Sequence, residues 1–159
     1  MSDSVSIKTA AEEFFKLKRI AVAGVSSVQK DAANFIYTTL RDKGYDVFPL
    51  NPKVNTIEGD KCYPDISSVP GGVDGVIAVT KPDATLQIVK QCYEAGVKHV
   101  WMHKSFGDSV SKEAVVFGKE KGMKIIPGGC PMMFIEGADF GHKCIKAVLT
   151  IFGRIPSKV

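Results

Sequence analysis

Long tracts of a single chemical character are missing from this sequence. No five or six basic residues occur together, and the formal net charge of the 159 residues is only +4, so a clustered nucleic-acid footprint is not expected. No apolar run approaches the roughly 18–20 residues of a membrane span. Residues 1–8 lack the basic start and apolar middle of a signal peptide. We therefore expect a cytoplasmic protein without nucleic-acid or membrane partners, whose mildly basic surface suits an anionic small ligand.

Closely spaced cysteines are also missing. The four cysteines are widely and irregularly spaced and form no C-x-x-C pair; they are Cys62, Cys92, Cys130 and Cys144. Neither a zinc site nor a disulfide framework is expected from this spacing, and reduced thiols are the default in the cytoplasm. We assign no metal ligands.

No stretch rich in proline, serine and glycine divides the chain, so we expect one domain over residues 1–159. Its apolar fraction of 45% is enough for a core. Within the domain, helical stretches repeatedly end at a glycine, and a strand begins one or two residues later. Gly44, Gly96 and Gly122 occupy these positions, and glycine tolerates the left-handed conformation that closes a helix.

Five short apolar runs are predicted to be strands buried on both faces of a parallel sheet. They are residues 20–23, 47–50, 73–79, 99–102 and 124–126. Two of the intervening helices are expected to bury one face each, formed by Ala33, Ile36, Tyr37 and Leu40 and by Leu86, Val89 and Tyr93. Alternation of strands and helices predicts an α/β fold, a Rossmann-like doubly wound parallel five-stranded sheet with helices on both faces.

A helix is predicted at each end of the domain. The first covers about residues 9–17, because Thr9 and Glu12 have the spacing of a capping box. Its Phe14, Phe15 and Leu17 are expected to press against the domain. The closing helix covers about residues 140–152.

The turn after the first strand has only part of a dinucleotide fingerprint. Of the three glycines in G-x-G-x-x-G it retains Gly24, while Ser26 and Gln29 replace the others. Ligands of doubly wound sheets bind beyond the carboxyl ends of the strands, and backbone amides at a helix start bind phosphate. We predict that Gly24, Val25, Ser26 and Ser27 form a diphosphate-binding turn. The alternative is a plain tight turn with a serine cap.

No acidic residue follows the second strand, where NAD-binding domains usually place one for the ribose hydroxyls. Asn51, Pro52 and Lys53 stand there instead. A lysine at this position suits a ribose that carries a phosphate, as in coenzyme A or NADP. The alternative is a solvated surface lysine.

The remaining strand ends supply candidate lining residues. Thr80, Lys81 and Pro82 follow the third strand, with helix capping as the alternative role. Met102, His103 and Lys104 end and follow the fourth, and we interpret His103 as structural or ligand-lining. Cys130 follows the fifth strand, where we interpret it as a buried small residue and assign no catalytic residue.

The strand ends together resemble the coenzyme-A-binding domain family, which includes small stand-alone proteins and a domain of the succinyl-CoA synthetase α subunit. The segments that carry the likeness are residues 19–27, 44–53, 59–64, 96–102 and 129–131. The resemblance implies coenzyme A binding through the turn at Gly24, a basic phosphate contact at Lys53, and further contacts that include Cys62 and Tyr63. The synthetase's second domain, with its phosphorylated histidine, has no counterpart here. His103 and Lys104 also depart from the glutamine or glycine common in the family.

The leading hypothesis is therefore a binding module for coenzyme A or an acyl-CoA that catalyses no reaction. The alternatives are an NADP-dependent oxidoreductase and a regulatory protein that binds no nucleotide. Either thiol of Cys62 or Cys130 would form a mixed disulfide with bound coenzyme A only if it were accessible; buried, inert thiols are the favoured alternative. The acyl group and the oligomeric state, a homo-oligomer included, stay open.

Overall fold

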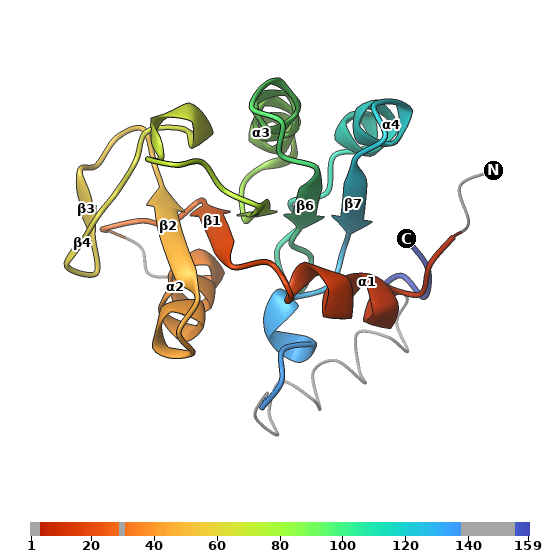
Figure 1. Ribbon diagram of the computed structural model, residues 1–159, viewed down its shortest axis with the longest axis horizontal. Coiled ribbons are helices and arrows are strands. Elements are labelled where there is room, and N and C mark those ends of the chain that lie inside the picture. Colours follow the sequence, from red (N-terminus) through yellow and green to blue (C-terminus); the bar gives the residue numbers. More distant parts are fainter. Residues whose placement is uncertain (1–3, 29–30, 138–154) are drawn as a thin grey trace.

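The computed structural model describes residues 4–28, 31–137 and 155–159, and its centre is a five-stranded parallel sheet (Figure 1). The sheet strands are β1 (Arg19–Ala23), β2 (Asp46–Leu50), β5 (Gly75–Ala78), β6 (His99–Met102) and β7 (Lys124–Pro127). The α-helices are α1 (Ile7–Phe14), α2 (Ala32–Asp42), α3 (Pro82–Glu94) and α4 (Lys112–Glu120). Short elements complete the described chain: β3 (Thr56–Ile57), β4 (Asp60–Lys61), η1 (Ile66–Ser68) and η2 (Pro131–Met133). The predicted fold class is confirmed.

Helices cover both faces of the sheet, with α1 and α2 on one side and α3 and α4 on the other (Figure 1). Strand side chains alternate between the two faces. In β1, Ile20 and Val22 join the core under α1 and α2, while Ala21 and Ala23 join the core under α3. Burial on both faces explains why these strands read as continuous apolar runs.

The predicted glycine stops close the helices that precede strands. Gly44 has φ +87°, its N–H donates to the carbonyl of Arg41 at 3.0 Å, and the N–H of Tyr45 donates to that of Leu40 at 3.1 Å. These two bonds form a Schellman motif, which satisfies carbonyls left without partners at a helix end. Gly96 and Gly122 close α3 and α4 in the same way.

Two local predictions are wrong in detail. The first helix begins two residues earlier than expected and ends at Phe14, because Ser6 is its N-cap and accepts a hydrogen bond from the N–H of Thr9 at 3.1 Å. In α3 the buried residues are Thr85, Val89 and Cys92. Tyr93 is 45% exposed and packs edge-on against Phe117 of α4, with ring centroids 5.8 Å apart.

The sequence analysis did not anticipate the hairpin formed by β3 and β4. Its two-residue loop is Glu58–Gly59, and both residues have positive φ, 51° and 84°. Two consecutive positive φ values are typical of a type I′ turn, which matches the twist of paired strands. The closing helix expected at 140–152 lies outside the described residues.

The order of strands in the sheet is β2-β1-β5-β6-β7. The chain therefore runs outward from β1 in one direction to β2 and then in the other direction from β5 to β7. Doubly wound sheets bind ligands at such a switch point, beyond the carboxyl ends of the two central strands. Here that position lies after Ala23 of β1 and Ala78 of β5, which are register partners.

Candidate functional site

The turn after β1 packs tightly against the end of β5. Gly24 has φ +101°, and a Cβ atom at this position would lie 2.0 Å from the carbonyl oxygen of Val79. Its N–H donates weakly to the carbonyl of Leu50 in β2, at 3.4 Å. Only glycine fits this crossing, because any side chain would overlap the neighbouring backbone.

Two side-chain amides hold the rest of the turn. Asn34 of α2 accepts from the N–H of Ser26 at 2.9 Å and donates to the carbonyl of the same residue at 2.8 Å. Asn51, after β2, donates to the carbonyl of Val25 at 2.7 Å. In the described chain no protein oxygen accepts from the backbone amides of Val25 or Ser27. The turn is thus fixed from two sides. Val25 is fully buried, whereas Ser27 is exposed and its backbone amide is left without a protein acceptor among the described residues.

The segment after β2 lies beside this turn. The side chain of Asn51 accepts from the N–H of Lys53 at 2.8 Å, which bends the chain around the exposed Pro52. Lys53 is exposed, and no ion-pair partner of it occurs among the residues described. The backbone of Tyr63 continues the outer edge of β2, donating to Pro49 and accepting from Asn51, both at 2.9 Å.

After β5, Thr80 and Lys81 lead into α3. The hydroxyl groups of Thr80 and the fully buried Thr85 lie 2.9 Å apart. Lys81 is the N-cap residue without a side-chain capping bond, and Pro82 takes the first helical position. Lys81 thus occupies the N-cap position, as the capping alternative for this segment predicted. Its exposed side chain makes no capping hydrogen bond.

His103 follows β6 and is only 2% exposed. Its Nε2 atom lies 3.2 Å from the hydroxyl of Ser105. Burial lowers the pKa of the imidazole, and the carboxylates of Asp31 and Asp108 oppose that shift. Lys104 forms an ion pair with Asp108 at 3.1 Å. The loop after β6 therefore contains a buried, neutral histidine and a lysine whose charge is paired with a carboxylate.

The thiols of the three described cysteines are buried and protonated at neutral pH. Burial raises the pKa of Cys130 to about 11 and that of Cys92 to about 12, and it also raises the pKa of Cys62. Thiolates are the reactive form, so these environments favour inert sulfurs over exchange with a ligand thiol. Cys144 and His142 lie outside the described residues.

The structure brings most of the predicted residues to one edge of the sheet. Four of them are buried there and present little or no surface to a ligand: Met102 and Val25, which are fully buried, His103, which is 2% exposed, and Cys62, which is 4% exposed. The sequence analysis missed Asn34. Its signal was a polar residue directly beside the apolar positions of α2, where it is 4% exposed.

Two cavities lie away from this edge. One of about 690 Å³ lies between α1, β7 and the chain end at Val159, and another of about 450 Å³ lies between α3 and α4. Neither is lined by a residue of the glycine turn or of the loop after β5. We place the site by topology, because extended nucleotides lie across the strand ends of doubly wound sheets.

Strand order and the glycine turn define a doubly wound α/β domain with a conformationally fixed turn at its switch point. The chain belongs to the CoA-binding domain family, whose sequence profile matches residues 18–136. This range contains every predicted ligand-contacting residue.

Three relatives illustrate the family. The α subunit of acetate–CoA ligase [ADP-forming] II from Pyrococcus furiosus is 31% identical over 125 residues, which are 74% of this chain and 27% of the subunit. The uncharacterized protein YneT of Bacillus subtilis is 26% identical over 113 residues, which are 71% of this chain and 82% of YneT. The structure of a hypothetical protein from Pyrococcus horikoshii OT3 superposes with a TM-score of 0.74 at 30% identity, covering 87% of this chain and 99% of that protein.

The chain spans only about a quarter of the length of the ligase subunit. In the described ranges, no helix has both the length and the apolar character to cross a membrane. The same ranges contain no cluster of three or more metal-ligating side chains. The cytoplasmic location and the homo-oligomer stay predictions.

Proposed function

We propose that this chain binds coenzyme A, free or acylated, beyond the carboxyl ends of β1 and β5. The observation that carries the proposal is the turn at Gly24, whose backbone is fixed by two side-chain amides while the exposed Ser27 keeps an amide donor. Donors of this kind bind phosphate without a charged side chain. The diphosphate of the ligand would lie on this turn.

Lys53 would contact the phosphate on the ligand's ribose. It is exposed, it follows the strand next to the turn, and the Asn51 side chain that bends its backbone also holds Val25. The turn and the lysine are therefore connected through one residue. Thr80 and Lys81 would line the remainder of the ligand path.

The proposed role is binding without catalysis. The buried imidazole of His103 has a lowered pKa, and the buried cysteines have raised ones, so neither supplies an activated nucleophile. The ligase subunit that this chain resembles is nearly four times longer than the matched segment.

A ligand panel tests the proposal. Thermal unfolding is measured with coenzyme A, acetyl-CoA, dephospho-coenzyme A, NADP and NAD, each at rising concentration. A ligand present at about 100 times its dissociation constant stabilises the folded protein by about 2.7 kcal/mol. We expect stabilisation by coenzyme A. Stabilisation by NADP alone would favour the oxidoreductase alternative, and no response to any ligand would favour the nucleotide-free alternative.

A further inference from the structure

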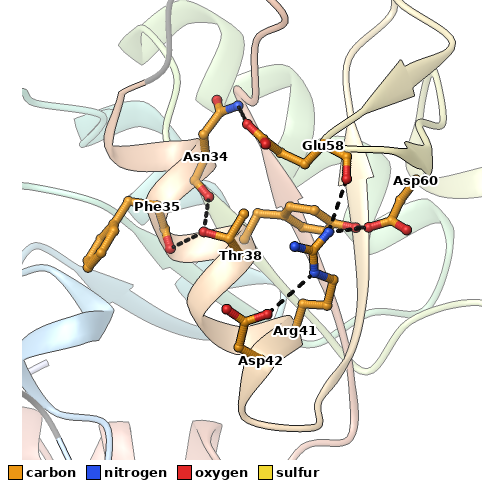
Figure 2. A network of polar contacts seen from close by, with 8 residues as sticks. Asn34, Phe35, Thr38, Arg41, Asp42, Glu58 and Asp60 are labelled. Atoms are coloured by element: carbon orange, nitrogen blue, oxygen red, sulfur yellow. Dashed lines mark hydrogen bonds and ion pairs between the residues drawn. The ribbon is translucent and has the colours of Figure 1, made fainter.

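Asn34 is a buried polar residue that is hydrogen-bonded to the glycine turn. Its side-chain amide pairs with the N–H and C=O of Ser26 at 2.9 and 2.8 Å, as a neighbouring strand would. The same amide nitrogen donates to the Glu58 carboxylate at 3.2 Å (Figure 2). Asn34 therefore joins the turn after β1 to the β3–β4 hairpin, whose Glu58 lies 24 residues after Asn34 in the sequence.

The hairpin is itself held against α2. Arg41 donates to the Asp60 carboxylate at 2.7 Å and to the carbonyl of Glu58 at 3.2 Å (Figure 2). The hydroxyl of Tyr37 donates to the same carboxylate at 2.5 Å. The Tyr37 and Arg41 bonds lower the pKa of Asp60, so this carboxylate is charged at neutral pH. The position of Glu58 is thus set by α2, from which Asn34 also projects.

We propose that Asn34 is a positioning residue for coenzyme A: it sets the conformation of Ser26, and thereby the direction of the turn amides, while Glu58 orients its side chain. The inference rests on the proposed function, because it gives the turn a ligand to hold. An asparagine is required at this position because one side chain must donate to the Ser26 carbonyl and accept from its N–H. A carboxylate accepts only.

The variant Asn34→Asp tests this requirement with almost no change in shape. At pH 8 its carboxylate faces the carbonyl of Ser26 and the carboxylate of Glu58. We expect the dissociation constants for coenzyme A and dephospho-coenzyme A to rise by the same factor of about ten, because an unsatisfied buried carbonyl would distort the turn and not the ribose-phosphate contact.

The pH dependence of the affinity for coenzyme A distinguishes a positioning role of Asn34 from a merely structural one. Burial and the neighbouring Glu58 carboxylate raise the pKa of an aspartate at this position. Once protonated, it donates to the Ser26 carbonyl again. The affinity deficit of Asn34→Asp relative to the natural protein should therefore shrink between pH 8 and pH 5.5, and Glu58→Gln in the same chain should reduce it at pH 8.

Controls separate the two proposals. Thr38→Ala lies one turn along α2 and loses only bonds to the carbonyls of Asn34 and Phe35, so it should bind coenzyme A like the natural protein. If Asn34→Asp does not fold at pH 8, Glu58→Ala provides the test, with an expected weakening of two- to threefold. The positioning role would be overturned if the natural protein and Asn34→Asp bound coenzyme A with equal affinity. Where Glu58→Ala replaces Asn34→Asp, equal affinity in that variant would overturn it. No binding by the natural protein would instead overturn the proposed function.

Discussion

Replacement of Gly24 by alanine should destabilise the fold far more than replacement of other left-handed glycines. The alanine would adopt φ near +101°, which costs about 1–2 kcal/mol for a residue with a Cβ atom. That atom would also lie 2.0 Å from the carbonyl oxygen of Val79. Forcing β1 and β5 apart to relieve the overlap costs about 1–3 kcal/mol, as overpacking does. The expected loss is about 2–5 kcal/mol.

Gly44→Ala is the matched control. Gly44 also has positive φ, 87°, but nothing lies within 4 Å of the position that its Cβ would take. We expect a loss of only about 1–2 kcal/mol there, from the backbone alone. Urea unfolding of both variants and the natural protein measures the two free energies, with equal slopes required for the comparison.

The difference between the two variants isolates the close approach of the turn to β5. Equal losses would refute the reasoning, since they would mean that the turn moves aside at no cost. The crowding also has a consequence for ligand studies. Gly24→Val tests whether the turn forms at all and does not isolate phosphate binding. A substitution of Asn34 tests the turn amides more directly.

Three further predictions concern single side chains. Lys53→Ala should weaken coenzyme A binding by about tenfold and dephospho-coenzyme A binding hardly at all, as measured by titration calorimetry; equal losses would assign Lys53 another role. Burial holds the pKa of His103 in the folded protein below its ordinary 6.5. As the pH drops, the imidazole is therefore protonated in the unfolded chain before it is protonated in the folded protein. The free energy of unfolding should accordingly fall from about pH 7 toward the lowered pKa of the folded state. His103→Gln should flatten that decline in urea unfolding, and an unchanged slope would contradict it. In a Cys144→Ser variant, Cys62 and Cys130 should form no adduct with oxidised coenzyme A unless urea is added. An adduct detected by intact mass spectrometry on the folded variant would instead show an accessible thiolate.

The elements that repeat a local pattern were predictable from the sequence alone. Apolar runs such as residues 20–23 indicated strands buried on both faces, and Gly44 marked a helix end followed by a strand. These signals are local because hydrophobic periodicity and glycine's conformational freedom act over a few residues. They were sufficient for the fold class, while the family was identified from the resemblance of the strand-end segments.

What depends on contacts between distant segments was decided only by the tertiary structure. The strand order and the overlap that excludes a Cβ atom at Gly24 join residues that lie far apart in the sequence. The pairing of Asn34 with Ser26 spans only eight residues, but it depends on how the turn after β1 packs against α2. The Asn34 amide illustrates the physical reason. A polar residue beside the apolar face of a helix is unfavourable until a specific backbone group satisfies both its donor and its acceptor, and only the folded chain brings that group within 3 Å.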